Sequence, residues 1–437
     1  MHLSSTKEII VYNIIWSVLG KIVTLLGSLF IGIIVARYLG PKQYGIMNYV
    51  ISYVTLFQII AYFGLDSIEV REEAKENIPA NTIIGTAFGL KCILAVITVA
   101  ITFLTAIIFQ SDTKIIIYIT IYSVSVIANT LSVIRNRFTS LLQNEYVVKS
   151  EISRTLIGMA LKAAMLLCHL PLIWFIAASA FDFVLLGGGY IYCYHRKIGR
   201  MKQWKFDYKY ASFLLKESFP LLLTSAAVFI YQRIDQVMIG DMIDKESVGF
   251  FATANRFVEI LIFVPAMIAH TITPVLVKIR EKSNEEYDVK SQQFMNLIFW
   301  LTALMSLILS VSSFMIIRYT FGMSYLQAVP ILKVLAFKAT AFALSTTAGA
   351  MLVLEGLQKY AIFRDLFGCA VCIVLNYLML PKYGAIAAAY IAIVSYICAG
   401  YLSDAIIPAY HHLFRKQTIT IFYGWLDVIR IKTLLKR

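Results

Sequence analysis

The sequence predicts an all-α integral membrane protein in which twelve membrane-spanning helices form two pseudo-symmetric bundles of six. Three observations support this fold class. First, 59% of the 437 residues are hydrophobic and only 15% are charged, whereas soluble domains average about 45–50% and about 25%. Second, apolar stretches of about 20 residues, which cross a bilayer core as a helix, recur along the whole chain. Third, a short connector in the first half has a counterpart in the second half.

The first copy of this connector runs from Ala36 to Gly45, with the sequence ARYLGPKQYG, and the second runs from Gly240 to Gly249, with the sequence GDMIDKESVG. Gly45 and Gly249 are 204 residues apart in a chain of 437, and a new apolar segment begins at each. Duplication of this kind indicates a membrane protein built from two similar halves. We expect both copies to form short turns on the outer side of the membrane.

The apolar stretches place the twelve predicted helices in chain order. They span residues 12–36, 44–64, 83–109, 115–134, 155–169, 171–194, 218–239, 248–275, 293–317, 328–354, 361–380 and 384–407. The fifth is the shortest and contains Lys162, so it fits the pattern least well. Because each half holds an even number of helices, both halves should have the same orientation. A pseudo-two-fold axis along the membrane normal is then expected, with a cleft between the halves.

The segments between these helices are too short for a further globular domain. The predicted external connections are 37–43, 110–114, 169–171, 241–247, 318–327 and 381–384, and the longer cytoplasmic ones are 66–82, 135–154, 195–217 and 277–292. A domain needs about 50 residues, so we expect no catalytic residues and no enzyme activity. The mixed-charge stretch Leu65 to Ala80 is expected to form a short surface helix.

The basic loop near residue 200 divides the chain into predicted domains. These are an N-terminal six-helix bundle over 1–197, a cytoplasmic basic linker over 198–217, a C-terminal six-helix bundle over 218–409 and a cytoplasmic tail over 410–437. The tail contains the apolar residues Trp425, Leu426, Ile429 and Leu434 and the basic residues Arg430, Lys432, Lys436 and Arg437. This composition is typical of an amphipathic helix at the membrane surface.

The net charge of +14 could indicate a nucleic-acid partner, but the positions of the charges argue against one. Only six of the 39 Lys and Arg residues lie in the predicted external loops: Arg37, Lys42, Lys114, Lys245, Arg318 and Lys382. This bias predicts a multi-pass protein with both termini in the cytoplasm. The basic loop from His195 to Lys216 is expected to contact anionic membrane lipids.

No cofactor or metal site is expected from the remaining motifs. Cys369 and Cys372 form a C-x-x-C inside an apolar helix, where packing is favoured over metal binding or redox chemistry. Gly187, Gly188 and Gly189 follow no strand, so they do not predict a phosphate-binding loop. Because no nucleotide motif is visible, direct ATP hydrolysis is not expected.

In this plan the chain resembles the polysaccharide flippases of the MOP superfamily, in the Wzx or O-antigen repeat-unit branch. The similarity covers nearly the whole chain and depends on the order of several motifs. They are Asn13, Trp16, Ala36-Arg37-Tyr38-Leu39-Gly40-Pro41, Tyr44-Gly45, Gly64, Phe219-Pro220, Asp235, Ile239-Gly240, Val248-Gly249, Ala254 and Pro381-Lys382-Tyr383-Gly384.

The resemblance implies alternating-access export of an undecaprenyl-diphosphate-linked oligosaccharide repeat unit across the bacterial inner membrane. A H⁺ or Na⁺ gradient would drive the cycle, and the product would be O-antigen for lipopolysaccharide or a related polysaccharide. A polysaccharide polymerase and chain-length proteins would be the expected partners.

Cations inside the predicted helices point independently to an anionic substrate. A charge at the bilayer centre costs at least ~2.5–3.5 kcal/mol, so it usually faces a cavity or a partner. Cations outnumber acids in these helices, and a diphosphate would supply the missing negative charge. The predicted substrate-binding residues are Lys21, Lys91, Arg233, Arg256, Lys333 and Lys338. In related lipid II flippases, arginines on the first and eighth helices line the cavity, which favours Lys21 and Arg256.

Two intramembrane acids are predicted to couple transport to an ion. Asp182 lies near the middle of the sixth predicted helix with no cation at helical spacing. The alternative is a structural pair with Lys91 or Lys162. Glu259 lies three residues after Arg256, so the two could instead neutralise each other.

Two other functions remain as alternatives. A MATE-type drug or cation antiporter would share the architecture, but its cavity should be acidic rather than cationic. A membrane glycosyltransferase or polymerase would use the same lipid-linked sugars, but such enzymes need substantial external loops. The longest predicted external loop, 318–327, has about ten residues and no acid.

Overall fold

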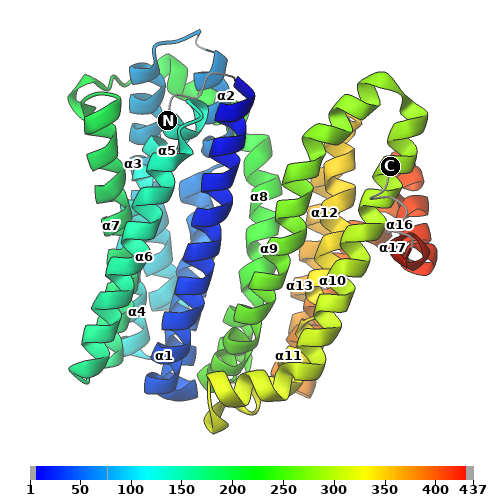
Figure 1. Cartoon of the computed structure of the whole chain (residues 1–437). Coiled ribbons are helices and arrows are strands. Elements are labelled where there is room, and N and C mark those ends of the chain that lie inside the picture. Colours follow the sequence, from blue (N-terminus) through cyan, green and yellow to red (C-terminus); the bar gives the residue numbers. More distant parts are fainter. Residues whose placement is uncertain (1–5, 76, 430–437) are drawn as a thin grey trace. The chain divides into compact units, whose positions relative to one another are not determined.

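The computed structural model describes residues 6–75 and 77–429, and every regular element in this part of the chain is helical (Figure 1). The chain divides into two compact units, Met1–Phe229 and Ile230–Arg437. We call them unit 1 and unit 2. Their boundary falls inside a helix, beyond the predicted linker over 198–217.

Unit 1 is a bundle of long helices. Its elements are α1 (Thr6–Tyr62), α2 (Leu65–Lys75), α3 (Ala80–Phe109), α4 (Thr113–Ala128), α5 (Ser132–Ser140), α6 (Asn144–Leu167), α7 (Leu172–Lys197) and the first part of α8 (Tyr208–Met242). Helix α6 packs between α1 and α7, and the three run side by side in Figure 1. Residues 198–207 pack onto α3, where the Lys205 amide donates to the Asn81 carbonyl at 3.1 Å.

Helix α1 contains the first two predicted spans because its backbone breaks at a single residue. Gly40 has φ +70° and ψ 170°, a conformation that glycine adopts at little cost and other residues avoid. Pro41 follows, and a proline suits the first turn of a helix because that turn needs no N–H from it. The predicted loop over 37–43 is therefore wrong in length, since one residue makes the connection.

Unit 2 contains the rest of α8, then α9 (Lys245–Lys282), α10 (Asn284–Thr320), α11 (Ala328–Leu335), α12 (Lys338–Leu354), α13 (Ala361–Tyr383), α14 (Ala385–Ile397), a π-helical turn (Cys398–Leu402), α15 (Ser403–Ile406), α16 (His411–Tyr423) and α17 (Trp425–Ile429). The predicted connection over 277–292 is wrong, because only Ser283 separates α9 from α10. Its hydroxyl caps α10 by accepting from the Glu286 amide at 3.3 Å. The polar residues of this segment therefore extend α9 and α10 beyond their apolar stretches.

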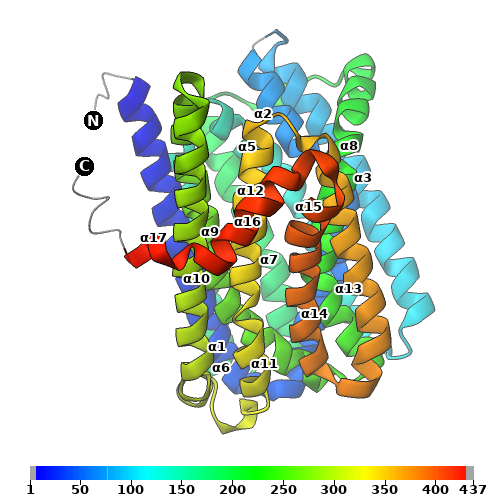
Figure 2. The same cartoon turned by 90° about the vertical axis from the view of Figure 1, so that its right-hand side faces the viewer.

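The last two helices pack across unit 2 instead of continuing its long axis. Figure 2 shows α16 and α17 crossing α10 obliquely. The Trp300 indole donates to the Thr420 carbonyl at 2.9 Å, and the Asn296 amide donates to Asp427 at 2.7 Å. These bonds hold the part of the predicted tail up to residue 429 against the bundle, and residues 430–437 lie outside the described residues.

The predicted fold class is confirmed. Within the described residues, nine helices are long and apolar enough to cross a membrane, or ten with α8, which bends by 46° between Leu223 and Ser225. This total counts α1 once although it holds two predicted spans. It omits α6, whose charged residues Glu151, Arg154 and Lys162 interrupt the apolar run. With both included, six predicted spans precede the basic loop near residue 200 and six follow it.

Candidate functional site

Several charged residues of unit 1 form a largely buried group that we call the Lys91 cluster. Lys91 on α3 is only 3% exposed. Its ammonium lies 2.6 Å from an Asp66 carboxylate oxygen and 2.8 Å from a Glu69 oxygen. Asp66 also binds Arg135 of α5 at 2.8 Å, and Asn136 donates to both carboxylates. Two cations and two carboxylates therefore balance one another.

The acids of this cluster come from α2, which the sequence predicted only as a surface helix. Asp66, Glu69 and Glu73 recur at intervals of three and four residues, so they share one helical face. That face is turned toward α3 and α5, and Glu73 accepts from Ser140 at 2.6 Å. The surface prediction is thus wrong for this face, since cations from two other helices neutralise its carboxylates. The spacing of these acids was the signal in the sequence that could have predicted a shared, charge-paired face.

A second charge pair joins α6 to α7. The Lys162 ammonium lies 2.5 Å from an Asp182 carboxylate oxygen. Gly158 makes the approach possible, since a Cβ atom there would lie 2.3 Å from the other Asp182 oxygen. The sequence left two alternatives for Asp182, ion coupling and a structural pair, and the structure contains the pair with Lys162.

Two cations predicted to bind substrate lie in unit 2 near Glu259. Arg233 of α8 approaches Glu259 of α9 at 3.6 Å, and both side chains are between one third and about two fifths exposed. Asn255 donates to Glu259 at 3.0 Å. Arg256 follows Asn255 on α9 and is half-buried. Glu259 therefore pairs with a neighbouring helix, which the i, i+3 spacing alone did not predict.

A deeper group, which we call the Asp235 cluster, lies between α8, α12, α13 and α14. Asp235 is 1% exposed. One of its oxygens accepts from the Asn376 amide at 2.8 Å and from the Cys372 thiol at 3.4 Å. Its second oxygen and the side-chain oxygen of Asn376 have no hydrogen-bond partner among the described residues. Burying polar oxygens without partners is costly.

Lys338 of α12 completes this cluster and is 4% exposed. Its ammonium lies over the Tyr396 ring, 5.8 Å from the ring centroid. Its positive charge lies near enough to Asp235 to interact with it electrostatically. No carboxylate of the described chain comes within 4 Å of it. The Asp235 cluster thus holds opposite charges without direct contact, together with two oxygens that could bind a small cation.

Two predicted substrate-binding lysines are exposed instead. Lys21 lies on α1 among exposed apolar side chains such as Leu19 and Ile22, and Lys333 lies near the end of α11. Neither ammonium pairs with a carboxylate of the described residues. Either lysine can therefore bind an anionic ligand without first breaking an ion pair with a described residue.

A further buried pair was missed by sequence reasoning. Arg364 of α13 lies 3.3 Å from Asp404 of α15, and both side chains are at most 5% exposed. The Arg364 guanidinium also donates to the Ala399 carbonyl in the π-helical turn at 3.0 Å. The partners are 40 residues apart and lie near the ends of two predicted spans, so no helical spacing linked them.

Within the described chain, no three His, Cys, Asp or Glu side chains gather as a metal site would require. Cys369 and Cys372 are both free thiols and both buried. Cys372 serves the Asp235 cluster as a hydrogen-bond donor.

Comparison with known proteins adds the family. The family model described as "Polysaccharide biosynthesis protein" matches residues 10–280, more than half of the chain. No curated protein matches significantly. Among solved structures, the lipid II flippase MurJ in an inward closed conformation is 15% identical, with a TM-score of 0.71 over 95% of this chain and 96% of that chain.

Two further structures share the fold. An inward-facing multidrug resistance MATE family transporter is 14% identical, with a TM-score of 0.65 over 94% of this chain and 96% of that chain. A MOP superfamily transporter from Pyrococcus furiosus is 14% identical, with a TM-score of 0.61 over 98% of this chain and 96% of that chain. The protein has the MOP superfamily fold, and it belongs to the polysaccharide biosynthesis protein family.

Proposed function

We propose that the protein is a flippase for an undecaprenyl-diphosphate-linked oligosaccharide repeat unit. It moves this lipid from the cytoplasmic to the outer face of the bacterial inner membrane by alternating access. Both termini lie in the cytoplasm. The family supports a role in polysaccharide biosynthesis. The observation that carries the proposal is the pair of exposed lysines, Lys21 and Lys333, which lack carboxylate partners in the described chain.

The charge balance supports a narrower set of substrate contacts than the sequence predicted. Lys91 is bound by two carboxylates, and a substrate would have to displace both. Lys338 is buried, with its ammonium over the Tyr396 ring. We therefore assign diphosphate binding to Lys21, Lys333, Arg233 and Arg256. The two arginines can each offer two N–H groups to a phosphate, whereas the lysines act as point charges.

We assign ion coupling to the Asp235 cluster instead of Asp182 or Glu259. Asp182 already has a cation at 2.5 Å, and Glu259 has Arg233 nearby. Asp235 is buried with an unpartnered oxygen, and so is its neighbour Asn376. A proton on Asp235, or a Na⁺ ion on these oxygens, would remove that penalty. Binding would therefore be favourable, and it would change the charge facing Lys338.

The test is a flipping assay with the purified full chain in vesicles. A fluorescent undecaprenyl-diphosphate sugar is placed in one leaflet, and the loss of its accessibility is followed with and without a Na⁺ or pH gradient. We expect gradient-dependent flipping above that of protein-free vesicles. The same vesicles are assayed for organic-cation uptake and for sugar transfer. Cation transport without flipping would establish the antiporter alternative, and sugar transfer would establish the enzyme alternative.

A further inference from the structure

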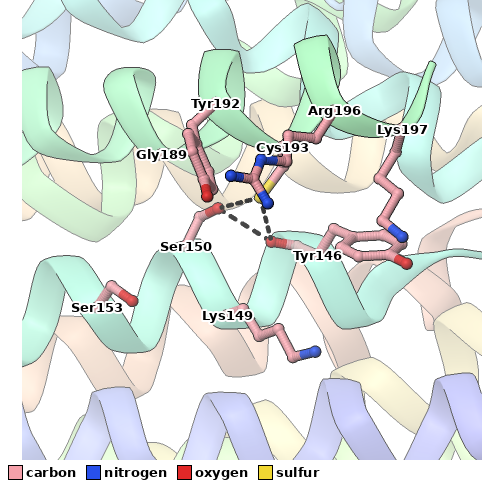
Figure 3. Close-up of a pocket in the computed structure, with 9 residues that line it drawn as sticks. All are labelled: Tyr146, Lys149, Ser150, Ser153, Gly189, Tyr192, Cys193, Arg196 and Lys197. Carbon is pink, nitrogen blue, oxygen red and sulfur yellow. Dashed lines mark hydrogen bonds between the residues drawn. The ribbon is translucent and has the colours of Figure 1, made fainter.

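A cavity of about 320 Å³ lies between α6 and α7 of unit 1, away from the clusters described above (Figure 3). Nine residues line it: Tyr146, Lys149, Ser150, Ser153, Gly189, Tyr192, Cys193, Arg196 and Lys197. Three of them are cations and none is an acid. The volume lies at the lower end of the range for small-molecule pockets.

The helical repeat explains why these residues meet. On α6 the lining residues recur every three or four positions from Tyr146 to Ser153, and on α7 they do so from Gly189 to Lys197. Gly189 lets the helices approach closely, because a Cβ atom there would lie 3.0 Å from that of Ser150. The Ser150 hydroxyl also lines the cavity, and it donates to the Tyr146 carbonyl at 2.9 Å.

Aromatic rings hold two of the cations at the cavity. The Arg196 guanidinium lies 5.0 Å from the Tyr192 ring centroid, and the Lys197 ammonium lies 5.2 Å from that of Tyr146 (Figure 3). Neither cation forms an ion pair with a described residue. Lys149 is different, since Glu145 already accepts a hydrogen bond from it. Two positive charges at the cavity therefore have no carboxylate within ion-pair distance among the described residues.

The surface beside the cavity is apolar and open. Leu156 and Ile157, one turn beyond Ser153 on α6, are each more than half exposed. On α7, a Cβ atom at Gly188 would meet nothing within 4 Å, and Val184 one turn earlier is exposed. Helix α7 is apolar enough to span a membrane, so its final turns should lie at headgroup level. The cavity therefore combines three cations with a mostly apolar lining, and exposed apolar side chains lie one turn away on both helices.

We propose that this cavity binds the phosphate headgroup of an anionic phospholipid, whose acyl chains lie along α6 and α7 beside Gly188. Arg196 offers a planar pair of donors to the phosphate, and Lys197 adds a second charge. The exposed Ser153 hydroxyl, which bonds to no described residue, can bind the glycerol portion. Free phosphate shares the headgroup chemistry, but it would leave the apolar surface unused.

Cations in the last turn of a helix also interact favourably with its carbonyl ends. That role requires neither a cavity nor an open apolar surface, so a variant that changes only the surface separates the two. Gly188→Trp adds a large side chain where the structure has free space, and it leaves every charge in place.

The experiment is native mass spectrometry of the full chain released from vesicles of equal phosphatidylglycerol and phosphatidylcholine content. We expect the protein to retain phosphatidylglycerol preferentially. Arg196→Ala combined with Lys197→Ala should reduce that preference by roughly tenfold or more, and Gly188→Trp should reduce it at unchanged net charge. The matched control is Lys202→Ala with Lys209→Ala, which removes two exposed cations outside the cavity.

Three outcomes would overturn the proposal. One is an unchanged preference in Gly188→Trp, which is the decisive variant if the double variant fails to fold. Another is an equal loss in the Lys202 and Lys209 control, which would assign the preference to overall charge. The third is displacement of the lipid by millimolar glycerol phosphate, which would assign the cavity to a soluble anion.

Discussion

The Lys91 cluster of unit 1 and the Asp235 cluster of unit 2 each bury a lysine and a carboxylate, but they balance charge differently. In the Lys91 cluster, Lys91, Arg135, Asp66 and Glu69 each have an opposite charge within 2.8 Å. In the Asp235 cluster, the lysine has no carboxylate of the described chain within 4 Å, and two oxygens lack partners. The charges of the Lys91 cluster therefore neutralise one another, whereas the unpartnered oxygens of the Asp235 cluster are suited to bind an ion.

The largest effect should come from breaking the Lys91 cluster. Lys91→Met leaves Glu69, which is 1% exposed, without its cation. Removing one partner of a buried pair costs about 3–5 kcal/mol, so thermal unfolding of the detergent-solubilised protein should shift strongly downward. Lys114→Met, at an exposed lysine, is the control. Adding Glu69→Gln should recover part of the loss. Equal stability of Lys91→Met and its control would show that the cluster is not structural.

Asp235→Asn should separate stability from coupling. The amide oxygen can still accept from Asn376, so the loss of stability should be far smaller than that of Lys91→Met. The carboxylate that would take up a proton or Na⁺ is gone, so flipping should lose at least most of its gradient dependence. Flipping under imposed Na⁺ and pH gradients measures this. Asp182→Asn should retain coupling, and the opposite ranking would return the coupling role to Asp182.

The Lys162 and Asp182 pair should show an intermediate effect. Lys162→Met, Asp182→Asn and the double variant form a thermodynamic cycle, in which we expect a coupling energy of about 1–3 kcal/mol. Gly158→Ala should mimic the single variants, because its Cβ would collide with the Asp182 carboxylate. Additive effects in thermal unfolding would mean that the two charges do not interact.

The smallest effect is expected at Glu145 and Lys149, where the lysine is 51% exposed. Lys149→Ala should cost less than about 1 kcal/mol. The hydrogen bond from Lys149 lowers the pKa of Glu145. The pair therefore stabilises the fold above the carboxyl's unfolded pKa, and this contribution is lost as pH falls through the lower folded pKa. Unfolding of wild type and variant should converge in acid; a constant difference would point to packing.

Hydropathy predicted the helices well because each bilayer crossing needs its own apolar run. It predicted their connections less well. The loops expected at 37–43 and 277–292 are single-residue breaks at Gly40 and Ser283. Helical hydrogen bonding continues through polar residues once they leave the apolar region, and hydropathy does not record that.

The ion-pair partners in the candidate site were harder to predict from the sequence than the helices were. Lys91 pairs with acids more than 20 residues earlier, and Arg364 pairs with an acid 40 residues later. Such pairs depend on how neighbouring helices are rotated, which a single sequence does not specify. The acid spacing on α2 showed that Asp66 and Glu69 share a face, but not which helix that face meets. Exposure of Lys21 and Lys333 likewise follows only from packing.

The most direct measurement compares flipping of the fluorescent undecaprenyl-diphosphate sugar by two double variants. One is Lys21→Ala with Lys333→Ala, and the other is Lys114→Ala with Lys382→Ala, whose lysines are also exposed. Both remove two charges, so membrane insertion and unfolding should match. We predict that the first variant loses at least tenfold in flipping rate while the second keeps the wild-type rate. Equal rates in both would contradict a role for these lysines in moving an anionic lipid.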